Sequence, residues 1–226
     1  ENWCMIGYHA TSVIADAMVK NVGDFNHERA LTASVNTATV RYFDGLGDYM
    51  DYKYVPDDKS HSSVSKTLEY AYDDWTVGQM ALALGKDEDY QYYHNRAHNY
   101  KNVFDQEVGY VRRKYSDSTW VENFKPLGED QVSWLGPGYV EGNAWQYTYF
   151  VPHDIGGLID LMGKDEFNNR LEEGFRISAE HKFNSEKLGS NSLTGMGVLP
   201  VNHGNQPNMQ AAYLFNYSGK PWLTQY

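Results

Sequence analysis

A short stretch in the second half of the chain gathers residue types that could act on a sugar. Glu141 lies in the segment Tyr139-Val-Glu-Gly-Asn-Ala-Trp-Gln-Tyr147, which also carries three aromatic rings. Hydrolysis of a glycosidic bond requires one carboxylic acid that protonates the departing oxygen and a second carboxylate that acts as base or nucleophile. Aromatic rings with a polar handle can cover the apolar faces of sugars. The stretch therefore indicates a carbohydrate site in which Glu141 is the candidate acid.

Polar side chains follow this glutamate closely. Asn143 and Gln146 offer neutral oxygens that suit a hard cation or sugar hydroxyls. His153 and Asp154 could orient each other and a substrate hydroxyl, and Trp145 could form the floor of a sugar pocket. Each has a structural alternative: the amides could cap loops, Asp154 could cap the helix that follows it, and Trp145 could pack in the core.

The composition excludes several classes of protein. The 226 residues are 41% hydrophobic without a long apolar run, so no membrane-spanning segment is predicted. The formal charge of −11 and a pI near 5.1 argue against a nucleic-acid surface but are compatible with neutral sugars. The single cysteine, Cys4, excludes an intrachain disulfide. The sequence contains no Gly-x-Ser-x-Gly elbow, phosphate loop or His-Glu-x-x-His motif.

The spacing of apolar residues predicts a series of amphipathic helices. Helices are expected over 13–20, 28–39, 65–84, 87–104, 142–150, 155–162, 165–177 and 207–217. Loops are expected over 45–59 and 120–137, with a possible short strand over 108–112. Thr11 or Ser12 is expected to cap the first helix and Gly23 to end it. Because strand signals are sparse, the chain is predicted to be all-α.

Two turns in the chain repeat one pattern. Leu84-Gly-Lys-Asp-Glu88 and Met162-Gly-Lys-Asp-Glu166 each place a glycine where it can end one helix and an aspartate where it can cap the next. Each turn follows a tryptophan, Trp75 or Trp145, which suggests a weak internal repeat of paired helices. Helical hairpins of this kind close most naturally into a toroid of inner and outer helices, although spacing alone supports only an all-α assembly.

Several blocks of the sequence, in order along the chain, resemble glycoside hydrolase family 92, the calcium-dependent, inverting exo-α-mannosidase family. They cover residues 5–17, 64–75, 139–146, 150–154, 202–207 and 219–225. The resemblance implies that the chain is part of an (α/α)6 toroid built from helical hairpins. It also implies that Glu141 is the general acid and that calcium contacts the sugar in the −1 subsite. The implied substrate is a mannose-containing oligosaccharide or glycoprotein glycan, and the implied location is secreted or periplasmic.

The resemblance leaves the calcium ligands to be chosen from amides. Asn143, Gln146 and Asn205 are the candidates, and no loop with regularly spaced acids is present as an alternative. His203 and Gln206 lie in Asn202-His-Gly-Asn-Gln-Pro207, where α-1,2-specific family members have His-Gly-Asn-Glu-Pro and use the His and Glu to hold the leaving mannose. Because Gln206 lacks that charge, another linkage becomes possible.

Two further positions differ from the family or need a choice. Tyr8 and His9 stand where relatives carry Asp-Pro after the glycine, with the Asp holding the −1 sugar. Asp73 and Asp74 are adjacent within a predicted helix, so they point about a third of a turn apart. We expect at most one of them to face the interior and the other to be solvated.

Two parts that the family needs for turnover are not found in the sequence. One is the general base, an aspartate in an acidic, glycine-containing motif that follows the Gly-Lys-Pro-Trp block, and the other is an N-terminal β-sandwich. The sequence also starts at Glu1 without an initiator Met. Residues 1–226 are therefore expected to be a partial catalytic domain that is inactive alone. The alternatives are a non-catalytic sugar-binding or structural α-helical module and an unrelated α/α-toroid hydrolase.

Overall fold

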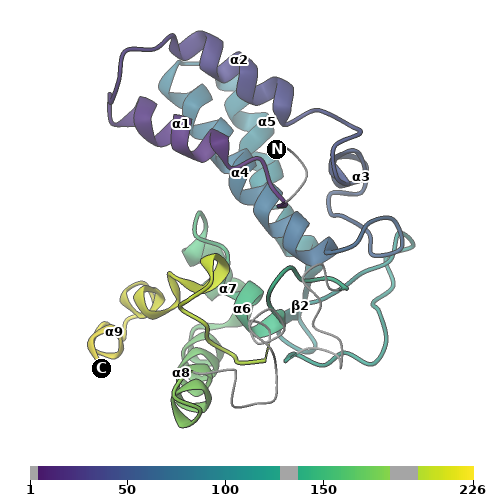
Figure 1. Cartoon of the computed structure of the whole chain (residues 1–226), viewed down its shortest axis with the longest axis vertical. Coiled ribbons are helices and arrows are strands. Elements are labelled where there is room, and N and C mark those ends of the chain that lie inside the picture. The colour runs from purple at the N-terminus through teal and green to yellow at the C-terminus, as the bar shows by residue number, and fades with distance from the viewer. Residues whose placement is uncertain (1–4, 128–136, 184–197) are drawn as a thin grey trace. The chain divides into compact units, whose positions relative to one another are not determined.

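The computed structural model describes residues 5–127, 137–183 and 198–226, and helices dominate these ranges (Figure 1). Strands within them are two residues long. Contacts divide the chain into two compact units, one that ends at Val103 and one that begins at Phe104. The prediction of a mainly helical chain is thus confirmed, and the toroid remains a prediction.

Helix α4 is the centre of the first unit. It spans Ser63–Ala83, and α1, α2 and α5 pack on it (Figure 1). The 3-10 helix η1 also packs on α4. The bounds of the other elements are α1 Ala10–Val19, α2 His27–Thr37, α3 Leu46–Tyr52, α5 Asp87–Ala97 and η1 Asn99–Val103. Because neighbours cover α4 on several sides, its apolar residues enter the core and most of its polar residues are buried as well.

The second unit is built from shorter elements. Its bounds are β1 Phe104–Asp105, β2 Tyr110–Val111, α6 Ala144–Thr148, α7 Ile155–Met162, α8 Lys164–Glu180, η4 Gln206–Asn208, η5 Ala211–Asn216 and α9 Trp222–Gln225. The strands pair antiparallel, with Phe104 opposite Val111. Trp145 of α6 packs with Tyr110 and Ala144 in an apolar cluster, so this tryptophan is a core residue of the unit.

The two glycine turns behave as the sequence predicts. Gly85 and Gly163 have φ values of +68° and +80°, the left-handed region in which glycine carries no steric penalty. The predicted aspartate caps are wrong. Asp87 and Asp165 lie inside the first turns of α5 and α8, and neither helix has a side-chain cap bond. Their negative charges interact favourably with the positive end of the helix dipole.

Several predicted boundaries are also wrong. Helix α1 begins at Ala10, so Thr11 and Ser12 lie inside it, and it ends at Val19, ahead of Gly23. Helix α3 occupies part of the predicted loop 45–59, because tertiary burial of Leu46 and Tyr49 stabilises a turn of helix there. The helix predicted over 87–104 is α-helical only to Ala97 and continues as the 3-10 helix η1. The helix predicted over 207–217 is replaced by the 3-10 helix η5. The loop predicted over 120–137 lies partly outside the described residues.

Candidate active site

Glu141 lies in a turn with an uncommon backbone conformation. Its φ is +49°, the left-handed region that side chains with a Cβ rarely adopt. The glycine beside it does not relieve this strain. A Cβ on Gly142 would come within 2.9 Å of Gln146 Oε1 and 3.0 Å of the Tyr147 ring, so Gly142 serves close packing while Glu141 takes the unfavourable φ.

Hydrogen bonds hold the main chain on either side of this residue. The Tyr147 hydroxyl donates to the carbonyl of Val140 at 3.1 Å, and Asn205 Nδ2 donates to the carbonyl of Glu141 at 2.9 Å. The Glu141 side chain is only partly buried. Within the part of the chain that the structure describes, its carboxylate makes no hydrogen bond or ion pair. The turn is therefore fixed through its backbone, and the carboxyl group is left for other partners.

The amides predicted near Glu141 organise the start of α6. Asn143 caps this helix by accepting from Gln146 N at 3.0 Å, and its Nδ2 donates to the carbonyl of Leu199 at 3.0 Å. Gln146 Nε2 donates to the same carbonyl at 2.8 Å. Both amides are fully buried. Since α6 begins at Ala144, the predicted helix start at Gly142 is wrong, and Glu141 precedes the helix.

Calcium would find ligands of a suitable kind among these residues. Asn143, Gln146 and Asn205 carry neutral oxygens, and an amide oxygen that accepts one hydrogen bond keeps a second lone pair. Their NH₂ groups point at main-chain carbonyls, which orients each amide oxygen away from those carbonyls. Among the described residues, no group of three or more His, Cys, Asp or Glu is placed to hold a metal. The donor chemistry fits calcium, and further ligands would have to come from elsewhere.

The other predicted site residues are spread over the second unit. Asp154 caps α7 and accepts a hydrogen bond from Gly157 N at 3.0 Å. This is the capping role that the sequence offered as an alternative to substrate binding. His153 beside it is half-buried, and Trp145 is 9% exposed in the core cluster. His203 and Gln206 are both exposed, at the approach to η4. The structure thus links Asn205 to Glu141 directly, whereas among the described residues neither His203 nor Gln206 forms a hydrogen bond or ion pair with Glu141.

In the first unit, α4 holds the N-terminal segment by a pair of acids. Glu69 and Asp73 are four residues apart and so lie on one face of the helix. Glu69 Oε2 and Asp73 Oδ1 each lie 2.7 Å from a ring nitrogen of His9, and Asp73 Oδ2 accepts from Tyr8 N at 2.7 Å. Burial lowers the pKa of His9, but the bonds to the two carboxylates outweigh it and raise the pKa to about 10. His9 is therefore an imidazolium at neutral pH.

The next acid along α4 is buried among different partners. Asp74 accepts from the hydroxyls of Tyr8 and Tyr49, at 2.6 and 3.0 Å, and from Arg96 Nε at 2.8 Å. Burial raises its pKa to about 6 although Arg96 opposes the shift. Asp73 and Asp74 are both fully buried. The prediction that one of them is solvated is wrong, because α4 is covered on several sides.

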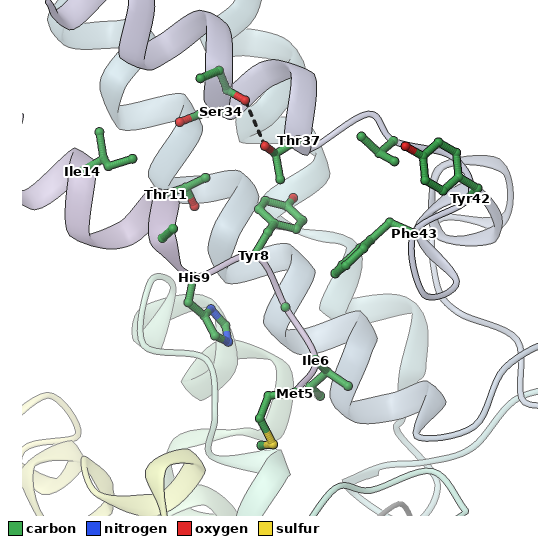
Figure 2. A pocket seen from close by; sticks show the side chains of 14 residues that line it. Met5, Ile6, Tyr8, His9, Thr11, Ile14, Ser34, Thr37, Tyr42 and Phe43 are labelled. Atoms are coloured by element: carbon green, nitrogen blue, oxygen red, sulfur yellow. Dashed lines mark hydrogen bonds between the residues drawn. The ribbon is translucent and has the colours of Figure 1, made fainter. Parts of the chain in front are cut away.

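A pocket of about 630 Å³ opens next to Tyr8 and His9 (Figure 2). Its wall is mostly apolar and comes from the N-terminal segment, α1, α2 and the connection to α3, with Ile14 and Phe43 among the lining residues. The size is that of a small-ligand pocket. Both ring nitrogens of His9 are occupied by carboxylates, however, so this histidine supplies neither a lone pair nor a readily released proton.

Sequence reasoning missed Glu69 and Arg96. The four-residue spacing of Glu69 and Asp73 inside one block could have revealed a shared helix face. Arg96 lies on α5, and only the packing of α5 against α4 brings it to Asp74. No local pattern in the sequence carries that information.

A mainly helical fold with a partly exposed acid in a strained turn, amides and aromatic rings suits a carbohydrate-active enzyme. Residues 1–226 match the glycosyl hydrolase family 92 catalytic domain along their whole length, and the chain belongs to this family.

Solved structures with the same fold include two enzymes from Bacteroides thetaiotaomicron. One, described as a family GH92 alpha-mannosidase in complex with mannoimidazole, is 41% identical with a TM-score of 0.87, and the match covers 100% of this chain and 29% of that one. The other, described as a family GH92 inverting mannosidase, is 31% identical with a TM-score of 0.82, covering 99% of this chain and 31% of that one.

A curated relative comes from the fungus Arthroderma benhamiae and is described as an uncharacterized secreted glycosidase. It is 28% identical, with 96% of this chain and 30% of the relative covered. The chain thus spans less than a third of the length of these relatives. None of the helices that the structure describes has the length and apolar character needed to cross a membrane.

Proposed function

We propose that the chain is part of the catalytic domain of an inverting, calcium-dependent exo-α-mannosidase in which Glu141 is the general acid. The observation that carries this proposal is the match to the family 92 catalytic domain along the whole chain. It is supported by the 41% identity to an alpha-mannosidase that binds mannoimidazole and by a relative described as inverting. An (α/α)6 toroid completed by the rest of a longer protein is part of the same proposal.

The reaction breaks the bond between the anomeric carbon of a terminal α-mannose and the oxygen of the leaving group. Glu141 gives its proton to that oxygen as the carbon–oxygen bond breaks and the ring acquires positive charge. Water attacks the anomeric carbon from the opposite face, and its proton passes to a carboxylate base. Inverting enzymes need that base about 6.5–9.5 Å from the acid so that the water fits between them. We propose that the base comes from a part of the longer protein outside residues 1–226.

The residues around Glu141 are suited to hold the sugar and the acid in place. The backbone of the turn is fixed by Tyr147 and Asn205, while the carboxyl group is free of ion pairs within the described residues. Asn143, Gln146 and Asn205 are the proposed calcium ligands, and a bound calcium would help to distort the −1 sugar ring toward its transition state. Trp145, His153 and Asp154 are proposed to support the sugar site, Asp154 through the cap that orients α7.

The exposed pair His203 and Gln206 is proposed to contact the leaving sugar. Both side chains reach solvent near η4. A neutral glutamine offers weaker hydrogen bonds to sugar hydroxyls than a glutamate, because charge-assisted bonds are about twice as strong. We therefore propose a linkage preference other than α-1,2. A secreted location is supported by the secreted relative.

Glu141→Gln in the full-length protein tests the proposed acid. Glutamine keeps the size of the side chain, but its amide is far too weak an acid to protonate the leaving oxygen. The rate on an unactivated α-mannobioside should fall by roughly 10²–10⁴, the usual contribution of a general acid. A mannoside with a nitrophenol-type leaving group needs little protonation and should lose far less. Equal rates for wild type and variant on the mannobioside would show that Glu141 is not the acid. Sugar binding without product release by the wild type would favour the non-catalytic module.

A further inference from the structure

The hydrogen bond between Asn205 and the Glu141 carbonyl joins residues 64 positions apart. Glu141 is held at φ +49°, and a non-glycine residue persists in that region only when the surrounding structure fixes it. Conformations of this kind concentrate at functional sites. The Asn205 amide bonds the carbonyl of the strained residue itself, which makes it the most direct clamp on the direction of the Glu141 side chain.

Asn205 is itself held rigidly. It is 3% exposed, and its Oδ1 accepts from Gln206 N at 3.0 Å at the start of η4. Its own N–H donates to the Asn202 carbonyl at 3.2 Å, and Asn202 N donates to Asn208 Oδ1 at 2.8 Å. The donor that meets the Glu141 carbonyl therefore belongs to a hydrogen-bonded turn and has little freedom to follow if the carbonyl moves.

We propose that Asn205 is a positioning residue for catalysis: by donating to the Glu141 main-chain carbonyl it keeps that residue in the left-handed conformation and so aims the acid at the glycosidic oxygen. The inference rests on the proposed role of Glu141 and adds a residue that acts through it. Asn205 does not touch the reacting atoms in this role. Its effect is on the placement of the proton donor, and misplacement by about 1 Å can cost about 100-fold in rate.

An aspartate at this position separates positioning from calcium binding. Asn205→Asp keeps an oxygen that can accept from Gln206 N and can bind calcium, but it removes the NH₂ that donates to the Glu141 carbonyl. A calcium-ligand role predicts that the aspartate is at least as good as asparagine. The positioning role predicts that it fails, because a carboxylate facing a carbonyl repels it.

Asn168 provides a matched control in the same unit. It is 2% exposed, and its Nδ2 donates to the carbonyls of Lys164 and Ser218, at 2.9 and 3.3 Å, away from Glu141. Asn168→Asp therefore removes the same kind of bond and buries the same charge. Any general loss of stability should appear in both variants, whereas an effect on the Glu141 turn should appear in one.

The experiment compares full-length wild type, Asn205→Asp and Asn168→Asp on an unactivated α-mannobioside and on a 2,4-dinitrophenyl α-mannoside, with and without excess calcium. Asn205→Asp should lower kcat on the mannobioside by about 10- to 100-fold and on the activated substrate by less than about threefold, since only the first requires a well-placed acid. Excess calcium should not restore the loss. Equal losses on both substrates, or recovery with calcium, would overturn the positioning role.

A second readout does not depend on activity. Amide hydrogen exchange in peptides that contain residues 138–143 should be faster in Asn205→Asp than in Asn168→Asp, because the turn loses its clamp. Exchange at the wild-type rate would overturn the inference whatever the kinetics show. Two results together would refute the proposed function and leave Asn205 as the clamp of the turn. The wild type would cleave no α-mannoside, and exchange in the turn would still be faster in Asn205→Asp.

Discussion

The acids of α4 and the acid of the Glu141 turn are held in opposite ways. Asp73 and Asp74 are fully buried, and each accepts hydrogen bonds from a cationic side chain and from Tyr8. Glu141 is partly exposed, and within the described residues its carboxylate has no such partner. The structure fixes the side chains of the α4 acids, whereas it fixes Glu141 through main-chain carbonyls.

This difference separates stability from catalysis. A buried carboxylate with a cationic partner is held as a charge, and removal of the partner is costly because an uncompensated charge is left behind. A general acid must gain and lose a proton in each turnover, so an ion pair through its carboxylate would hinder it. Support through the backbone places the acid without committing its oxygens. Substitutions in each region can show whether the two regions divide these tasks.

Arg96→Met should produce the largest loss of stability, since it leaves Asp74 buried without its cation. The expected decrease in the free energy of unfolding is about 3–5 kcal/mol, the usual cost of removing one partner of a buried ion pair. Urea unfolding of the full-length protein, followed by tryptophan fluorescence, would measure it. Lys20→Met is the control, because its exposed pair with Asp16 should contribute at most about 0.5 kcal/mol. A loss below about 1 kcal/mol for Arg96→Met would contradict the structural role of this pair.

His9→Gln should show a smaller, pH-dependent loss. The pKa of His9 is about 10 in the folded protein against 6.5 in the unfolded chain, so its contribution is complete below pH 6.5 and disappears as the pH rises through 10. Glu69 and Asp73 of α4 are the charged groups that face it. Because the His9 side chain is 43% exposed, solvent screening reduces the effect to about 1–2 kcal/mol.

The measurement for His9→Gln is the difference in unfolding free energy between variant and wild type at several pH values from 6.5 to 10. Asp74, with a pKa of about 6, has largely lost its proton before this window and affects both proteins alike. The difference should shrink as pH rises. A difference that is constant across the window would mean that the His9 charge does not stabilise the fold.

The sequence predicts local features of the fold better than long-range ones. The approximate extent of α4, the full extent of α7 and its Asp154 cap follow from apolar spacing and capping chemistry, which act within a few residues. The burial of both Asp73 and Asp74 could not be predicted, because it depends on Tyr8 and Arg96 arriving from distant segments.

The candidate site shows the same limit. The sequence pattern singles out Glu141 and its neighbouring amides as candidate site residues, but it does not predict which residue of the turn takes the left-handed conformation. The structure gives that conformation to Glu141, because Gly142 must lie against Gln146 and Tyr147. The clamp by Asn205 is also invisible locally, since the two residues are 64 positions apart. Local sequence rules are expected to fail at functional sites that contain backbone strain of this kind.

Glu141→Gly should raise stability slightly while it abolishes hydrolysis of the mannobioside. Relief of the left-handed strain is worth about 1–2 kcal/mol, and the greater freedom of glycine in the unfolded chain removes about 0.5–1 kcal/mol of that gain. Urea unfolding should show a net gain of roughly 0.5–1 kcal/mol. Lys53, an exposed residue with φ +64°, is the matched control. Lys53→Gly should give a similar gain with unchanged activity, and a destabilised Glu141→Gly would contradict the strain.

Gln206→Glu should produce the smallest effect. It tests whether a charge added at an exposed position of the second unit changes specificity without changing stability. Gln206 is exposed, so a carboxylate there carries little desolvation cost and should alter the unfolding free energy by less than about 0.5 kcal/mol. A charge-assisted bond to a leaving-sugar hydroxyl in the transition state should raise kcat/KM on α-1,2-mannobiose about threefold relative to α-1,3-mannobiose. The ratio of the two kcat/KM values is the measurement, because it cancels differences in active-site concentration. An unchanged ratio with unchanged kcat/KM on each substrate would place Gln206 outside the leaving-sugar site. An unchanged ratio with equal gains on both substrates would mean that the added charge acts on the acid and not on the linkage.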